Sequence, residues 1–342
     1  MNRAMTGALL AAILFGASTP AAKLLVGEMH PVLLAGLLYA GSGLGLSLWL
    51  ALRKERLAPL QRADLPWLAG AVLAGGIIGP VLLMVGLSSI GAASASLLLN
   101  LEGAFTALLA WLAFRENFDR RIALGMALIV GGGALLALDA GSSLATSPGA
   151  LAVAGACLAW AIDNNLTRKV AAADAATVAA IKGVAAGAVN IALAALAAAA
   201  WPGPGLAAAA ACVGLLGYGV SLALFVAALR ELGTARTAAY FSTAPFVGVA
   251  VALAVLGEAP SAEFWVAGAL MLAGVWLHIS ERHVHQHAHE PMQHDHRHVH
   301  DEHHRHAHDF DWDGAEPHSH PHRHGPLVHS HPHYPDLHHR HH

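Results

Sequence analysis

Two charged side chains lie inside long apolar stretches of this sequence. Glu102 stands near the middle of 91–114, and Lys182 lies in the first part of 175–199. An ionisable group deep in a bilayer is costly and therefore marks a functional site. We expect the two side chains to face one cavity and partly neutralise each other. Glu102 would take up a proton as a bound solute leaves, because burial disfavours the charged carboxylate. A static ion pair between helices, or a Lys182 side chain reaching toward the membrane surface, explains the same pattern.

A second polar group lies at the end of the apolar stretch 149–167. It contains Trp160, Asp163, Asn164 and Asn165. One carboxylate and two amides can bind a polar solute or a cation. The same residues also suit the water-facing end of a helix, and the sequence leaves both explanations open.

Four further residues are weaker candidates for the wall of a cavity. Asn100 is a single amide, for which hydrogen bonding between helices is the simpler explanation. Pro80 in GGIIGP, and Pro245 with Ser242 in STAP, interrupt regular helix because proline has no backbone donor. Such breaks line cavities or act as hinges, but they also occur as ordinary kinks in membrane helices.

The last part of the sequence concentrates histidine. All but two of the 25 histidines lie in residues 283–342, many in HxH alternation. Neutral imidazole binds Zn, Ni and Cu, and several nitrogens of a flexible string can converge on one ion. Few apolar residues are present, so we expect a disordered tail that binds divalent metal (Zn, Ni, Co or Cu), with no cofactor required. The candidate ligands are His283, His285, His287, His289, His294, His296, His298, His300, His303, His304, His306, His308, His318, His320, His322, His324, His329, His331 and His333.

Composition assigns the elements that must hold these residues to a membrane. The chain is 56% hydrophobic and 12% charged, with a mean hydropathy of +0.53, whereas soluble domains carry about 25% charged residues. A membrane-spanning helix needs about 20 apolar residues. Ten stretches qualify, which predicts an all-α fold: 5–25, 31–52, 66–87, 91–114, 121–139, 149–167, 175–199, 206–229, 233–256 and 262–280.

The ten stretches form two related halves. LSSIGAASASLLLNLEGAF (87–105) aligns with LRELGTARTAAYFSTAPFV (229–247) at an offset of 142. Phe15, Pro20 and Lys23 within 7–24 align with Trp160, Asn165 and Arg168 within 155–169 at an offset of 145. We therefore expect two five-helix repeats, 1–140 and 149–280, followed by the tail, 281–342. An odd number of spans in each repeat makes the two copies inverted.

Lysine and arginine collect in alternate loops, which sets the orientation. The loops after the even-numbered spans, such as RKERLAPLQR, are basic, and the other loops hold almost no Lys or Arg. Basic loops stay in the cytoplasm, so we predict a protein of the cell (inner) membrane with both termini cytoplasmic. The net charge of −3 predicts no nucleic-acid partner. The sequence leaves open whether the protein forms a homodimer.

The ten spans, arranged five plus five, resemble the drug/metabolite transporter superfamily, EamA type, over about residues 5–280. Arg115-Glu116 and Gly257-Glu258 end the corresponding spans of the two halves, although Arg115 stands where the family pattern has Gly. The resemblance implies a secondary carrier, not an enzyme, that exports a small polar metabolite or drug-like solute without ATP. Proton coupling would be consistent with Glu102.

The histidine tail keeps other functions open. The first alternative is a divalent metal (Ni, Co or Zn) efflux carrier that the tail feeds or regulates. Against it, only His30 and His278 lie in the membrane part. The second is a membrane-anchored metal sensor or buffer, but ten repeated spans exceed what an anchor needs. A third alternative, a membrane enzyme, is not supported, because the sequence shows no nucleophile–base constellation.

Overall fold

The computed structural model describes residues 3–53, 60–114, 120–138, 147–170, 174–232 and 234–279, together with 283–289, 293–298, 318–323 and 327–333. Contacts divide the chain into two compact units, Met1–Ser280 and Glu281–His342. Arg115 and Glu116, and the candidate ligands His300, His303, His304, His306, His308 and His324, lie outside the described residues.

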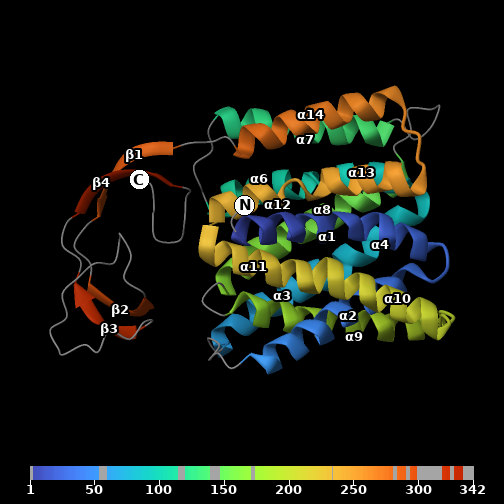
Figure 1. Cartoon of the computed structure of the whole chain (residues 1–342), viewed down its shortest axis with the longest axis horizontal. Helices are drawn as coiled ribbons and strands as arrows, with labels where there is room; N and C mark the ends of the chain where they lie inside the picture. The colour runs from blue at the N-terminus through green and yellow to red at the C-terminus, as the bar shows by residue number, and fades with distance from the viewer. Residues whose placement is uncertain are drawn as a thin grey trace. The chain divides into compact units, whose positions relative to one another are not determined.

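The first unit is helical in every described element (Figure 1). Its elements are α1 (Arg3–Val26), α2 (Pro31–Leu52), η1 (Arg62–Asp64), α3 (Leu65–Ala71), η2 (Val72–Ile78), α4 (Gly79–Ser89), α5 (Ala92–Leu98), α6 (Leu101–Phe114), α7 (Arg120–Leu138), α8 (Pro148–Thr167), η3 (Arg168–Val170), α9 (Ala175–Leu196), α10 (Pro204–Gly214), η4 (Leu215–Val220), α11 (Ser221–Leu232), α12 (Thr234–Phe241), α13 (Ala244–Leu256) and α14 (Ala262–Ile279).

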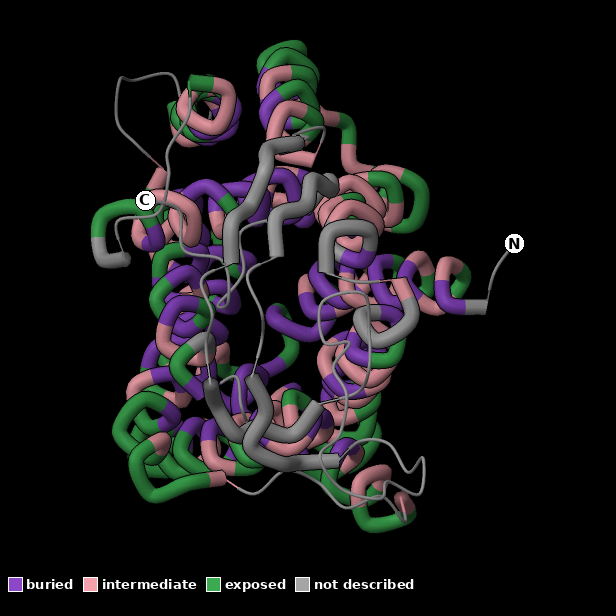
Figure 2. The backbone as a smooth tube through the Cα atoms, turned by 90° about the vertical axis from the view of Figure 1, so that its left-hand side faces the viewer, coloured by how far each residue is buried: buried purple, intermediate pink, exposed green. Residues whose placement is uncertain are grey.

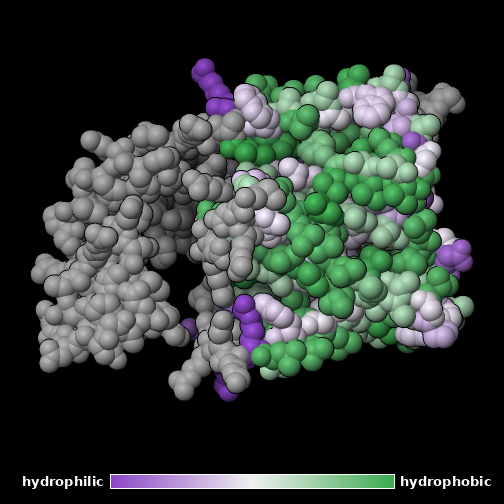
Figure 3. Space-filling model, in the orientation of Figure 1, coloured by the Kyte–Doolittle hydropathy of each residue, from purple (hydrophilic) through white to green (hydrophobic). Residues whose placement is uncertain are grey.

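The helical unit has the lengths and surface of a membrane domain. Nine helical segments within the described ranges are long and apolar enough to cross a bilayer. The tenth predicted span is α8, which has 20 residues but is less hydrophobic because it ends in polar residues that include Asp163 and Asn164. Hydrophobic residues cover the visible middle of the unit (Figure 3), and Leu48 and Trp276 are among the exposed large side chains. The fold is that of an all-α integral membrane protein, as the sequence predicts.

Both halves contain the same wide helical turn. The backbone N–H of Gly79 bonds to the Ala74 carbonyl at the end of η2, and that of Ser221 bonds to the Leu216 carbonyl at the end of η4. Both are π-helical i→i−5 bonds. The two bonds lie 142 positions apart, the offset that aligns the two halves in the sequence. The predicted irregularity at GGIIGP is therefore a π-helical segment.

A second pair of interruptions divides spans 4 and 9. Leu99 and Asn100 separate α5 from α6, and Ser242 and Thr243 separate α12 from α13. The side chains there serve local carbonyls: Asn100 Nδ2 donates to Leu97 O (2.8 Å) and Ser242 Oγ donates to Ala239 O (2.8 Å). The expectation that Asn100 bonds between helices is wrong, because its side-chain amide bonds to the Leu97 carbonyl, which also accepts the backbone N–H of Asn100.

The turn between α4 and α5 is held from both sides by charged residues. Lys23 Nζ of α1 donates to the carbonyls of Leu87 (2.6 Å) and Ile90 (2.9 Å), at the C-terminal end of α4. The Glu258 carboxylate accepts the backbone N–H groups of Ala92 (2.6 Å) and Ala93 (2.8 Å), at the start of α5. A cation at a helix C-terminus and an anion at an N-terminus are the favourable signs. The turn therefore joins α1 to the loop that follows α13.

Small residues let α2 and α9 approach closely. A Cβ added at Gly183 would lie 2.6 Å from the Gly43 Cα and 2.8 Å from the Gly43 N, and one added at Gly187 would lie 2.6 Å from the Ala40 N. These neighbours are backbone atoms, which cannot move aside without shifting a helix. Figure 2 shows the resulting pattern, with buried residues where helices meet and exposed residues on the outside.

We expect Gly183→Ala to lower the free energy of unfolding by about 1–3 kcal/mol, the usual cost of overpacking a tight interface. Gly131→Ala is the matched control, because a Cβ there meets nothing within 4 Å. Thermal unfolding of the two purified variants measures the difference. Equal midpoints would show that α2 and α9 can separate without cost.

Within its described ranges, the second unit contains four short strands: β1 (His283–His289), β2 (Gln293–His298), β3 (His318–Arg323) and β4 (Leu327–His333). β1 pairs antiparallel with β4, and β2 pairs antiparallel with β3. This backbone pairing differs from the disorder expected for the tail. Alternation of histidine with other residues has the two-residue period of a strand. Pro321 and Pro332 are tolerated because two-stranded sheets consist only of edges.

Candidate functional site

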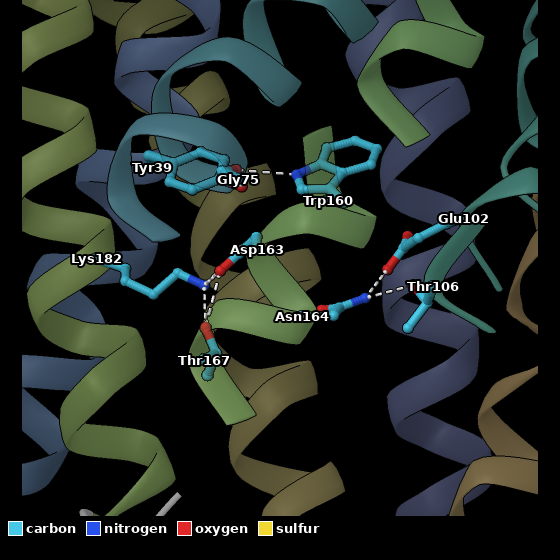
Figure 4. A network of polar contacts seen from close by, with 9 residues as sticks. All are labelled: Tyr39, Gly75, Glu102, Thr106, Trp160, Asp163, Asn164, Thr167 and Lys182. Atoms are coloured by element: carbon cyan, nitrogen blue, oxygen red, sulfur yellow. Dashed lines mark hydrogen bonds and ion pairs between the residues drawn. The ribbon is translucent and has the colours of Figure 1, made fainter. Parts of the chain in front are cut away.

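The helical unit contains a polar centre made of Tyr39, Gly75, Glu102, Thr106, Trp160, Asp163, Asn164, Thr167 and Lys182 (Figure 4). Its Gly75 backbone carbonyl has no hydrogen-bond partner within the helix. Gly79 would bond to the Gly75 carbonyl in an α-helix, but its N–H goes to Ala74 instead. Pro80, the partner in a π-helix, has no N–H. The Gly75 carbonyl accepts from Tyr39 OH (2.8 Å) and Trp160 Nε1 (2.9 Å), as Figure 4 shows. One carbonyl thus joins α2, η2 and α8.

The neighbouring carbonyl is satisfied in the same way. Pro80 also lacks the N–H that would bond to Gly76 in an α-helix. Asn190 Nδ2 of α9 donates to the Gly76 carbonyl (3.1 Å), and the Asn190 side chain is fully buried. This hydrogen bond joins α9 to η2.

Lys182 forms an ion pair with Asp163. Its Nζ lies 2.5 Å from both carboxylate oxygens, and the two side chains are only 17% and 8% exposed. Thr167 Oγ1 donates to Asp163 Oδ1 (2.8 Å), one helical turn along α8. The predicted pairing of Lys182 with Glu102 is wrong. Asp163 on α8 lies between α9 and α6, and is therefore nearer to the Lys182 ammonium group than Glu102 is (Figure 4).

Glu102 bonds to an amide instead of a cation. Asn164 Nδ2 donates to Glu102 Oε1 (2.9 Å) and to Thr106 Oγ1 (3.3 Å). Because Asp163 and Asn164 are adjacent on α8, the ion pair and the Glu102 group lie side by side in Figure 4. The sequence therefore identified residues of one cluster but misassigned their partners.

The side of this cluster near Glu102 is accessible. Asn164 is exposed and Glu102 is half-exposed, whereas the neighbouring Asp163 and Asn165 are buried. A Cβ at Gly103, the residue after Glu102, would meet nothing within 4 Å. The Glu102–Asn164 contact therefore joins α6 to α8 next to open space.

The other predicted residues have structural contacts. Asn165 Nδ2 donates to Ala161 O (2.9 Å) and Thr106 O (3.3 Å), which joins α8 to α6. Pro80 has no backbone N–H and so leaves the Gly75 and Gly76 carbonyls without a donor from the helix. Pro245 lines a small hollow with Ser96 and Phe15, among others, away from the ion pair. Ser242 stays at its local helix break.

Tyr39, Gly75, Thr106 and Thr167 complete the cluster. The proline offered a signal for Gly75, since Pro80 removes the donors for carbonyls four and five residues before it. Nothing in the sequence indicated Tyr39, because its donation to Gly75 depends on how α2 packs against η2.

Comparison with known proteins assigns the chain to a class. The family model described as "EamA-like transporter family" matches residues 2–138 and 147–280. An uncharacterized transporter of Methanothermobacter thermautotrophicus is 27% identical over 285 residues, covering 78% of this chain and 83% of that protein. One crystal structure is 20% identical, covers 81% of this chain and 97% of its own, and has a TM-score of 0.57, a likeness of fold.

The apolar helices and the matched family together define an integral membrane transporter. The chain belongs to the EamA-like transporter family, with its two matched segments falling on the two halves of the helical unit. The resemblance stated from the ten spans is confirmed.

Proposed function

We propose that this transporter is a secondary exporter of a small polar solute, which binds beside Glu102 and Asn164. The accessible Glu102–Asn164 contact carries the proposal, because it combines a carboxylate and an amide in the centre of a membrane domain. Glu102 comes from the first half of the chain, and Asp163, Asn164 and Lys182 come from the second. A site shared by two repeats can open to either side as the repeats move.

Proton exchange at Glu102 is part of this proposal. The groups around it are Asn164 and Thr106, which bond to each other, and the Asp163–Lys182 pair beyond. An ionised carboxylate is costly in a membrane when no cation accompanies it. Glu102 would then bind a proton whenever the solute is absent, and the proton gradient would drive export.

We expect Glu102→Gln to abolish export while leaving the fold intact. Glutamine keeps the side-chain shape and an oxygen that can accept from Asn164, but it cannot exchange a proton. The metabolites released into the medium and the cellular Ni, Co and Zn content are measured in cells with full-length protein, Glu102→Gln or the exposed control Glu263→Gln. A released metabolite that depends on Glu102 supports the organic solute, whereas a Glu102-dependent fall in one metal supports metal efflux. Identical profiles for all three proteins would contradict the proposed site.

We also propose that the tail binds divalent metal on the cytoplasmic side. The strand register supports this, because β1 and β4 bring histidine opposite histidine at three places: His283 with His333, His285 with His331, and His287 with His329. β2 and β3 repeat the arrangement at three more. Residues directly opposite on antiparallel strands have Cβ atoms about 4.5–5.5 Å apart, a spacing from which two imidazoles can reach one ion.

We expect the full chain to bind several Ni²⁺ or Zn²⁺ ions and a chain ending at Arg282 to lose them. Equilibrium dialysis of both purified proteins against each metal gives the number bound. Binding should also fall as histidine protonates below about pH 6, since only neutral imidazole coordinates a metal. Equal numbers of bound ions for the two chains would show that the metal binds outside the tail.

A further inference from the structure

A polar clamp lies at the end of the helical unit where α1 and α13 finish, on the right of Figure 1. The clamp consists of Lys23, Glu258 and the α4–α5 turn that both of them hold. Glu258 comes from the second half of the chain, whereas the backbone N–H groups that it accepts, those of Ala92 and Ala93, belong to the first. Hydrogen bonds to a carboxylate are stronger than those between neutral groups. Glu258 thus joins the two halves at this end, and movement of one half against the other would break its bonds.

The glycine in the turn leaves room for this carboxylate. A Cβ added at Gly91 would lie 2.8 Å from Glu258 Oε2 and 3.2 Å from Glu258 Cδ. A larger residue would therefore push the carboxylate away from the N–H groups of α5. Lys23 holds the other side of the turn through two carbonyls. The turn is thus fixed to α1 and to the second half at once.

A small hollow lies between three elements whose ends the clamp joins, α1, α5 and α13. Its lining includes Thr19 of α1, one turn before Lys23, and Ser96 of α5, one turn after Ala92. Pro245 of α13 lines it as well. Because one helical turn rises about 5.4 Å, Thr19 and Ser96 lie directly inside the clamp.

The hollow leads along span 4 toward the proposed solute site. Leu99 lines the hollow, and its carbonyl accepts the backbone N–H of Glu102 (3.1 Å). Glu102 is half-exposed, whereas Thr19 and Ser96, on the clamp side, are only 2% and 0% exposed. The solute site is therefore accessible, and the section between it and the clamp is closed.

The Ser96 hydroxyl in this hollow is fully buried and has no hydrogen-bond partner among the residues that the structure describes. A buried hydroxyl without a partner costs free energy, and such groups are rare. Water or a polar solute would supply the partner once the hollow opens. A Cβ at Gly248 would lie 2.7 Å from Ser96 Oγ and 2.9 Å from Gly16 O. At this crossing α1, α5 and α13 thus meet through small residues, which can part without displacing large side chains.

We infer that the hollow at Ser96 is one of the two routes between the Glu102 site and water, and that Glu258 holds this route closed. Release of Ala92 and Ala93 by Glu258 would let α13 move away from α5 and admit solute to Ser96. The inference rests on the proposed function for the site at Glu102. It adds the route on one side of that site and the residue that closes it.

Thiol labelling at Thr19→Cys tests the closure. The full chain in detergent is treated with the thiol reagent sulfonatoethyl methanethiosulfonate, and intact mass gives the labelling rate. The same chain with Thr19 unchanged gives the background from Cys157 and Cys212. Glu258→Gln keeps the side-chain shape but turns an amide donor toward one N–H group of α5, and Gly91→Ala displaces the carboxylate. We expect each to raise the labelling rate about tenfold or more, the factor for one lost hydrogen bond to a charged group.

Each clamp variant has a matched control. Glu263→Gln changes an exposed carboxylate at the start of α14, and Gly27→Ala adds a methyl group just after α1, where a Cβ meets nothing within 4 Å. Both should leave the labelling rate at position 19 unchanged. Met271→Cys, at a fully buried position of α14, reports a loosened fold and should stay unlabelled in every variant. Equal labelling at position 19 in all chains, or labelling that rises at position 271 as well, overturns the inference.

Transport separates this inference from the proposed function. Movement of the Glu102-dependent solute in liposomes is measured for Thr19→Cys before and after complete labelling, and the added group should stop it. Transport that continues after labelling overturns the route through the hollow and leaves the Glu102 site intact. Clamp variants that label faster in a chain that moves no Glu102-dependent solute uphold closure by Glu258 and contradict the proposed function.

Discussion

Replacing Lys182 with methionine is expected to lower the free energy of unfolding by about 3–5 kcal/mol, the cost of leaving a buried charge without its partner. Asp163 would remain, 8% exposed, with Thr167 as its remaining side-chain donor. Methionine fills a similar volume, so the loss reports on charge rather than packing. Thermal and denaturant unfolding of the purified protein in detergent measure it.

The double variant Asp163→Asn/Lys182→Met tests whether the stability loss of Lys182→Met comes from the unpaired Asp163 charge. Removing both charges leaves no unpaired ion, so its stability should return most of the way to that of the unchanged protein. Lys169→Met, at an exposed lysine just beyond α8, should change stability by less than about 1 kcal/mol. A double variant as unstable as Lys182→Met alone would show that the lysine contributes by packing.

Gly75→Ala is expected to abolish transport. A Cβ at this position would overlap the Asp163 carboxylate, and the same residue provides the carbonyl that holds Tyr39 and Trp160. The methyl group must therefore displace either the ion pair or the η2 backbone. Transport of the Glu102-dependent solute is measured in liposomes, with helix content and thermal midpoint recorded for the same preparation. We expect a stability loss of about 1–3 kcal/mol.

Gly131→Ala is the matched control for this substitution. Gly131 lies on α7, which contributes no residue to the polar centre, and a Cβ there would meet nothing within 4 Å. Its transport should stay near that of the unchanged protein. If Gly75→Ala transports normally, the contact between η2 and Asp163 has no part in function.

The sequence was sufficient to identify the residues of the polar centre, because ionisable side chains in apolar stretches are few. Glu102, Asp163, Asn164 and Lys182 all stood out, and all lie in one network. Their pairing could not be predicted, since it depends on the rotation of α8. Two adjacent residues on that helix turn to different partners, Asp163 to Lys182 and Asn164 to Glu102.

Helix breaks were predictable in position but not in kind. Gly75, Gly76 and Pro80 indicated an irregular span 3, yet the π-helical turn and the side chains that complete it follow from tertiary packing. In the tail, low hydrophobicity favoured disorder, while the two-residue period of histidine is compatible with the strand pairing observed. The inverted relation of the two halves and the cytoplasmic position of the termini stay predictions.

The paired wide turns also limit which changes of chain length the protein can accept. A π-helical turn contains one residue more than an α-helical turn would need, so it sets the rotational phase of everything after it. Deleting one residue within Val72–Ile78 would rotate α4 by about 100° relative to α3. Leu83, Met84 and Leu87, all buried in the core, would then turn toward lipid. Because η4 contains the matching turn, the helix after the turn has the same rotation relative to the helix before it in both halves. A lost residue in one half would have no counterpart in the other, so length in these segments is constrained more tightly than composition.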